Sequence, residues 1–166
     1  MLYPELTQEI SCMCQADQEM RKRNNREPEY WEEGLDQKHT IRMKEIVTQI
    51  GWPNASKVGY EAADYAELLV RHADHDVEFQ IKCLALMKSE PDHEIDKINI
   101  AYLEDRVRVN SKQPQLYGTQ FIDEGGKFTP REIENPEQVD ERRKYMGLPT
   151  LEEGMAQMYK KYPRVS

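Results

Sequence analysis

His72 is the side chain in this sequence best suited to proton transfer. The ordinary pKa of an imidazole is about 6.5, so modest burial tunes it for acid or base chemistry near neutral pH. A carboxylate would have to orient the ring, and the sequence offers Asp74, two residues later, and Asp105 on a following helix. We therefore expect His72 to be a general acid or base, with Asp74 or Asp105 as the carboxylate that orients it.

Several other polar side chains fall on helix faces that are otherwise apolar. Asp17 continues the stripe of Ile10 and Met13, and Asp105 is in register with Tyr102. Burying an unpaired polar group costs about 1–3 kcal/mol, so such groups should meet one another or a ligand. The alternative is that each is satisfied separately and serves only to fix helix register. The residues of this kind are Asp17, His39, His72, Gln80 and Asp105.

A second polar group lies in the segment from Gln113 to Gln120. Its alternation predicts a short strand over residues 115–122, with Gln115, Tyr117 and Thr119 on one face. Gly118 would allow a ligand or another backbone to approach closely. Amides and hydroxyls orient a polar ligand well but are poor nucleophiles. A polar edge strand without a ligand is the alternative interpretation.

Guanidinium groups complete the expected binding set, because they bind phosphates or carboxylates through two hydrogen bonds. We assign Arg21 and Arg106 to the substrate and expect Arg143 in a surface ion pair. The side chains expected to bind the substrate are Asp17, Arg21, Gln80, Arg106, Gln115, Tyr117, Thr119 and Gln120.

A metal-dependent reaction is a variant that the sequence disfavours. His39, His75-Asp76 and Asp105 occur in the order used by helical phosphohydrolases, in which a divalent ion activates water. His75, however, has the character of a linker residue. We therefore assign no metal ligands, and the sequence identifies no cofactor.

Length and charge limit the class of protein. The chain has 166 residues and a net charge of -8, which predicts a single domain over 1–166 and disfavours general nucleic-acid binding. No apolar run is long enough to span a membrane, and the first residues do not resemble a secretion signal. Three cysteines, an odd number, suit a reducing compartment. We expect a cytoplasmic protein, and the sequence leaves its oligomeric state open.

Apolar periodicity predicts a mainly α, compact multi-helix domain with a small β-hairpin in its C-terminal third. Small residues on several sides of the helix at 59–73 predict that it is central. Asp36 is the expected N-cap of the second helix, and Gly125-Gly126 the expected hairpin turn. The predicted helices cover residues 4–25, 36–50, 59–73, 79–87, 94–109, 137–146 and 151–162, and the hairpin pairs 115–122 with 127–129.

The order of short motifs resembles a family of uncharacterised proteins known only as a domain of unknown function, found mainly in bacteria and also in some viruses and eukaryotes. The resemblance covers nearly the whole chain and implies one compact domain with these polar residues as its signature, but no reaction. At His39 the family pattern favours Asn, which weakens a metal-ligand role. The matching motifs are Asp17-Gln18 with Arg21, Gly51-Trp52-Pro53, Ser56-Lys57-Val58-Gly59, His72-Ala73-Asp74, Phe79-Gln80, Ala101-Tyr102-Leu103, Asp105-Arg106-Val107, Gln115-Leu116-Tyr117-Gly118-Thr119-Gln120, Asp140-Glu141-Arg142-Arg143 and Gly147-Leu148.

Two functions from different classes fit these residues. The first is an intracellular enzyme with a polar pocket for a small, anionic, nucleotide-like substrate, which carries out hydrolysis or group transfer with His72 as acid or base. The alternative is a non-catalytic module that senses a small molecule or binds a protein. The alternative needs no nucleophile, and the sequence shows no activated Ser, Cys-His pair or phosphate-binding loop.

Overall fold

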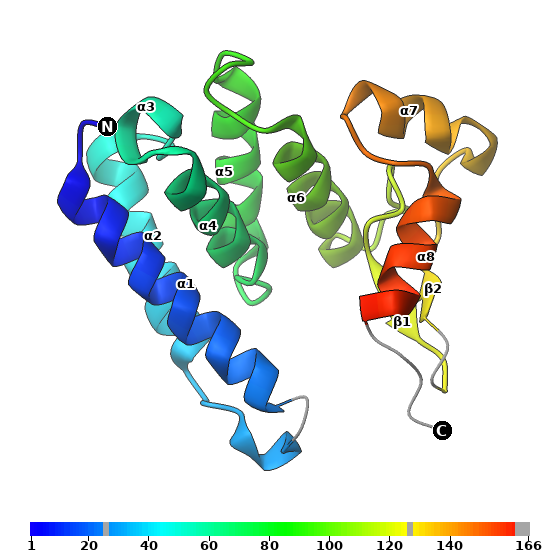
Figure 1. The fold of residues 1–166 in the computed structure, drawn as a ribbon, viewed down its shortest axis with the longest axis horizontal. Coiled ribbons are helices and arrows are strands. Elements are labelled where there is room, and N and C mark those ends of the chain that lie inside the picture. Colours follow the sequence, from blue (N-terminus) through cyan, green and yellow to red (C-terminus); the bar gives the residue numbers. More distant parts are fainter. Residues whose placement is uncertain (25–26, 126–127, 162–166) are drawn as a thin grey trace. The chain divides into compact units, whose positions relative to one another are not determined.

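The computed structural model describes residues 1–24, 27–125 and 128–161, and most of them are helical (Figure 1). The chain divides into two compact units, Met1–Asp96 and Lys97–Ser166. The organisation as one domain over 1–166 stays a prediction. In the described part of the chain, no helix is both long enough and apolar enough to cross a membrane.

The first unit is built around one central helix. That helix, α4, packs against α1, α2, α3 and α5. Ala62 and Ala66 on α4 are almost completely buried, and their small side chains let the neighbouring helices approach closely. The prediction of a central, small-residue helix is therefore confirmed. The elements of this unit are α1 (Pro4–Asn24), η1 (Pro28–Tyr30), α2 (Leu35–Ile50), α3 (Ala55–Val58), α4 (Tyr60–Arg71) and α5 (Val77–Ser89).

The second unit combines helices with a two-stranded antiparallel sheet. β1 pairs with β2, with Phe121 opposite Pro130, so the small hairpin in the C-terminal third is confirmed. The elements of this unit are α6 (Lys97–Asn110), β1 (Phe121–Asp123), β2 (Phe128–Pro130), η2 (Pro136–Gln138), α7 (Val139–Tyr145) and α8 (Leu151–Lys161).

The strand predicted over 115–122 is largely wrong. Only Phe121 and Ile122 belong to β1, and Gln115 forms an isolated bridge with Ile133. The residues between them are irregular because three of their backbone N–H groups bond to the carboxylate of Asp105 instead of to a neighbouring strand. A side-chain acceptor here replaces the sheet partner that the alternation predicted.

Element ends differ from the predictions by a few residues. Gly34, with a φ of 88°, is the N-cap of α2, so Asp36 is not the cap but lies in the first turn. Gly51 ends α2 as predicted, with its N–H bonded to the carbonyl of Val47. The predicted helix ends at 25 and 162 and the predicted hairpin residues 126 and 127 lie outside the described residues.

Glu67 is a carboxyl group buried inside the first unit, on α4, and only 2% of it is exposed. Burial raises its pKa to about 7, while the nearby charge of Arg71 opposes this rise and that of Asp64 adds to it. The Nε atom of Arg71 lies 3.1 Å from Oε1, but that oxygen accepts no hydrogen bond from the described residues. The folded state therefore favours the neutral form of Glu67.

This burial predicts a pH-dependent stability. A folded-state pKa of about 7 lies above the ordinary value of 4.5, so the contribution of Glu67 is complete below pH 4.5 and is lost as the pH rises toward 7. We expect the unfolding free energy of the parent, relative to Glu67→Gln, to fall by about 3 kcal/mol across that range. Urea unfolding of both proteins at several pH values measures this difference. A difference that grows with pH would show instead that the ion pair with Arg71 dominates.

Candidate functional site

His72 lies at the C-terminal end of α4, where its backbone N–H still bonds to the carbonyl of Leu68. Its Nδ1 atom is 3.0 Å from each carboxylate oxygen of Asp17, a residue of α1 that is completely buried. The carboxylate that orients His72 is therefore Asp17, and not Asp74 or Asp105 as expected from the sequence.

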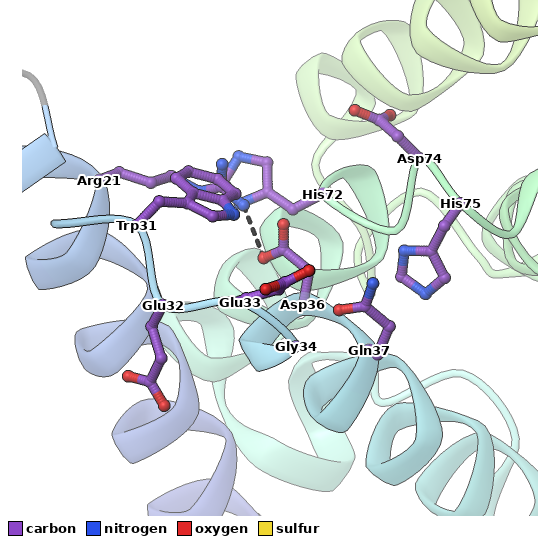
Figure 2. Close-up of a pocket in the computed structure, with 10 residues that line it drawn as sticks. All are labelled: Arg21, Trp31, Glu32, Glu33, Gly34, Asp36, Gln37, His72, Asp74 and His75. Carbon is purple, nitrogen blue, oxygen red and sulfur yellow. Dashed lines mark hydrogen bonds and ion pairs between the residues drawn. The ribbon is translucent and has the colours of Figure 1, made fainter. Parts of the chain in front are cut away.

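Two further side chains bond to Asp17. Arg21, one turn later on α1, donates from Nε to Asp17 at 2.9 Å, and Gln18 donates to the other oxygen at 2.8 Å. The second arm of Arg21 reaches Asp36 on α2 at 2.8 Å (Figure 2). Asp17 thus sits in a network whose donors are all side chains, and Arg21 is a positioning residue within it.

The protonation states follow from burial and these bonds. Burial lowers the pKa of His72, and the nearby charges of Arg21 and Arg71 act in the same direction, although Asp17 opposes them. Burial alone would raise the pKa of Asp17, but the bonds from His72 and Gln18 and the charge of Arg21 hold it below its usual value. Arg21 and Gln18, which also bond to Asp17, favour its ionised form. A neutral imidazole beside an ionised carboxylate is the resulting state near pH 7.

A cleft of about 520 Å³ opens beside His72 (Figure 2). Its walls come from the end of α1, from the segment between η1 and α2, from the first turn of α2 and from the connection between α4 and α5. The lining residues are Arg21, Trp31, Glu32, Glu33, Gly34, Asp36, Gln37, His72, Asp74 and His75.

Within the first unit, the structure brings together three of the predicted site residues with His72. Asp17 and Arg21 bond as described, and Asp74 lines the cleft with His72. Gln80 is completely buried and donates to the backbone carbonyls of Val70 and Arg71, at 3.3 and 3.0 Å. Gln80 therefore fixes the end of α4 from which His72 projects.

In the second unit, Asp105 organises a different network. Its carboxylate accepts bonds from the backbone N–H groups of Leu116, Tyr117 and Thr119, at 2.7, 3.0 and 2.9 Å, and from the Thr119 hydroxyl at 2.9 Å. Burial raises the pKa of Asp105, and these four bonds act against that rise. Asp105 therefore accepts the backbone hydrogen bonds that a neighbouring strand would otherwise accept. This role is structural.

The remaining predicted binding residues of the second unit are bonded within that unit. Gln115 is completely buried, and its amide binds the carbonyls of Gln120 and Arg131. The Gln120 side-chain carbonyl accepts a bond from Arg106 at 3.0 Å. The Tyr117 hydroxyl bonds to Glu104, and burial raises the pKa of Tyr117 to about 12. These bonds support the interpretation in which the polar set of the second unit holds its own backbone.

Two further expectations about the second unit need correction. Arg143 is not in a surface ion pair: it is buried and donates to the carbonyls of Tyr117 and Pro149. A Cβ at Gly118 would lie 2.7 Å from Leu151 and 2.9 Å from Ile133, and the φ at this glycine is 69°. The space that a Cβ at Gly118 would occupy is thus filled by side chains of the chain itself.

The sequence interpretation missed most of the cleft wall. The side chains not expected at a site were those of Trp31, Glu32, Glu33 and Gln37. Asp36 was expected only as a cap, and His75 was considered only in the disfavoured metal-dependent variant. The sequence feature that could have indicated this wall is Trp31, a large aromatic residue within a polar loop.

One side chain of the metal-dependent variant, Asp76, already has partners within the first unit. Asp76 caps α5 by accepting from the N–H of Phe79, and it pairs with Lys44. In the parts of the chain that the structure describes, no three His, Cys, Asp or Glu side chains are grouped to hold a metal ion.

The charge of Arg21 should control the basicity of His72. Replacing Arg21 by Gln removes a positive charge that disfavours the imidazolium, so we expect the pKa of His72 to rise. An NMR pH titration of the imidazole protons measures it, with Lys22→Gln, which removes an exposed charge from the same helix, as the control. An unchanged or lower pKa in Arg21→Gln would contradict this network.

Asp105 should be essential for the stability of the second unit. Asp105→Ala leaves three buried or half-buried N–H groups without their acceptor, so we expect a loss of about 4 kcal/mol in unfolding free energy. Chemical denaturation compares it with Glu137→Ala, an exposed control in η2. A loss below about 1 kcal/mol would show that water readily replaces the carboxylate.

The comparisons with known proteins place the chain at the level of family. The model of a family of unknown function, DUF6624, matches residues 4–164. No curated protein and no solved structure matches the chain. Because the match spans both compact units, the chain belongs to this family, DUF6624, whose function is unknown.

Proposed function

We propose that this protein is an enzyme in which His72, held by Asp17, acts as general base and then general acid on a small substrate bound in the cleft. The reaction class is hydrolysis or group transfer. One observation carries the proposal: Nδ1 of His72 faces both oxygens of a buried carboxylate, at 3.0 Å each.

That contact determines which nitrogen is free for chemistry. An ionised carboxylate only accepts hydrogen bonds, so Nδ1 of a neutral His72 carries the proton and Nε2 carries the lone pair. Among the described residues, no group donates a hydrogen bond to Nε2. His72 lines the cleft and its side chain is 19% exposed, so a substrate or a water molecule can reach it.

The chemistry then follows a simple sequence. Nε2 takes a proton from a water molecule as the water oxygen bonds to an acyl or phosphoryl centre of the substrate. The bond to the leaving group breaks, and the leaving group receives the proton from Nε2, which restores the neutral imidazole. Asp17 stabilises the imidazolium formed between these steps and keeps Nδ1 protonated throughout.

In this proposal the nucleophile is a water molecule or a hydroxyl group of a second substrate, activated by His72. The described residues that line the cleft include no Ser, Thr, Cys or Lys side chain. Water gives hydrolysis, and a hydroxyl group of a second substrate gives group transfer. The expectation of a nucleotide-like substrate stays a prediction, and a non-catalytic sensing or protein-binding module is the competing outcome of the test below.

The test is a screen for turnover of esters, amides and phosphate esters, with variants of the pair. We expect His72→Asn to lower kcat by about 100-fold to 10,000-fold with binding retained, because Asn keeps a hydrogen bond but cannot transfer a proton. Asp17→Asn should lower kcat as well, since it favours the wrong tautomer. His93→Asn is the matched control, because that imidazole is 79% exposed and does not line the cleft.

Each outcome separates the alternatives. Full turnover by the His72→Asn variant would show that His72 is not the general acid or base. A ligand that binds the parent and His72→Asn equally, with no turnover of any substrate by either, would favour the sensing module.

A further inference from the structure

His39 is a histidine of α2 that is buried without a hydrogen-bond partner. Only 7% of it is exposed, and its Nδ1 atom bonds to no other described residue. It shares a face of α2 with Met43 and Ile46, which are completely buried. A ring nitrogen that loses its contact with water and gains no bond destabilises the fold, whereas a leucine at this position would carry no such cost. Packing alone therefore does not account for His39.

The network that holds His72 begins one turn before His39 on the same helix. Asp36 accepts a hydrogen bond from Arg21 at 2.8 Å, and Arg21 donates in turn to Asp17 at 2.9 Å. Residues three positions apart in a helix lie on the same face, and helical side chains lean toward the N-terminus of their helix. The imidazole of His39 therefore leans toward the turn that contains Asp36.

The charges of this network also act on His39. Burial lowers the pKa of His39, and the charge of Arg21 acts in the same direction. The charges of Asp17, Asp36 and Glu32 oppose this decrease. His39 is therefore neutral near pH 7, and it lies close enough to the network to respond to its charges.

Water is the ligand that fits this nitrogen. His39 is not among the described residues that line the cleft, so it does not face a substrate there. The described residues also form no group of three or more His, Cys, Asp or Glu side chains that could hold a metal ion. Buried water molecules bond to polar groups that would otherwise be unpaired, and each needs about two to four such partners. The carboxylate of Asp36 supplies another partner, because each of its oxygens accepts more than one hydrogen bond.

We propose that Nδ1 of His39 and the carboxylate of Asp36 bind one ordered water molecule inside the first unit, and that this water fixes Asp36 against Arg21. His39 is then a positioning residue, which acts on His72 through the network and touches no substrate. Its effect on turnover rests on the proposed function, whereas the water site and its effect on the pKa of His72 do not.

The first measurement detects the water molecule in the full chain. Water-selective nuclear Overhauser spectra at pH 7 report whether a ring proton of His39 lies beside a slowly exchanging water molecule. We expect such a contact for His39 and none for His93, because the His93 side chain is 79% exposed and meets only water that exchanges rapidly. The absence of this contact at His39 would overturn the inference.

Three variants test what the water does, with the NMR titration of His72 as the readout. His39→Leu removes the nitrogen, so Asp36 holds Arg21 less firmly. Because the charge of Arg21 lowers the pKa of His72, we expect His72 to titrate at a higher pH, by a smaller shift than in Arg21→Gln. His39→Asn keeps a group that bonds to water and should titrate as the parent does. The control, Met43→Leu, changes the packing of the same face with little change in volume and should leave the titration unchanged.

Turnover of any substrate found for the parent should follow the same order. We expect His39→Leu to lower kcat by about ten-fold with KM unchanged, because a displaced Arg21 alters the transition state and not the binding of substrate. His39→Asn and Met43→Leu should retain the kcat of the parent.

Two further results would overturn the inference. One is a His39→Leu protein that melts at a higher temperature and titrates like the parent, which would show that His39 only packs. The other is a His39→Asn protein that titrates like His39→Leu. If His39→Leu does not fold, the water contact in the parent and the titration of His39→Asn decide.

The same data separate this inference from the proposed function. If the water contact and the titrations are as expected but no turnover is found, the water site stands and the proposed reaction falls. If turnover depends on His72 while His39→Leu leaves the titration unchanged, only this inference falls.

Discussion

The hydrogen bond between His72 and Asp17 links residues 55 positions apart and sets the requirements for the helices around it. Asp17 is completely buried on α1, and a buried carboxylate is tolerated only when its oxygens are bonded and its charge is compensated. The neighbours meet both needs: Gln18 and His72 supply hydrogen bonds, and Arg21 supplies a hydrogen bond and the opposite charge. Asp36 holds Arg21 in turn, which connects the start of α2 to the same network.

Asp17 and Asp105 are both buried, but their carboxylates have different roles. Asp105 is bonded to three backbone N–H groups and a hydroxyl, so its bonding capacity goes into shaping the segment that follows α6. Among the described residues, the donors to Asp17 are side chains, and one of these is an imidazole that lines a cleft. The difference lies in the donor: a backbone amide cannot transfer its proton, whereas the second nitrogen of an imidazole can.

Helical periodicity was enough to predict much of the fold and part of the site. It predicted α1, α2 and α4 to α8, but not the short α3, and it predicted the burial of Asp17, Gln80 and Asp105. The small residues of α4 predicted its central position. Periodicity could not predict which carboxylate meets His72, because that pairing depends on how α1 packs against α4. Spacing along one helix carries no information about such a contact.

The remaining errors have physical causes of the same kind. Alternation at Gln115 to Ile122 resembled a strand, but the N–H groups there bond to a side chain distant in sequence. Arg143 was expected at the surface because most arginines are exposed. It is buried because its guanidinium group donates hydrogen bonds to backbone carbonyls of the second unit. Trp31 lies in a loop, where no periodic pattern marks a side chain as part of a site.

The central claim is that His72 is a neutral imidazole with its proton on Nδ1 and its lone pair on Nε2. The most direct measurement is a long-range ¹H–¹⁵N NMR spectrum of the ¹⁵N-labelled protein at pH 7, because the two ring nitrogens of each tautomer have distinct chemical shifts. We predict a protonated Nδ1 and an unprotonated Nε2 for His72. An Nε2-protonated ring, or an imidazolium with both nitrogens protonated at this pH, would contradict it and leave the cleft without its base.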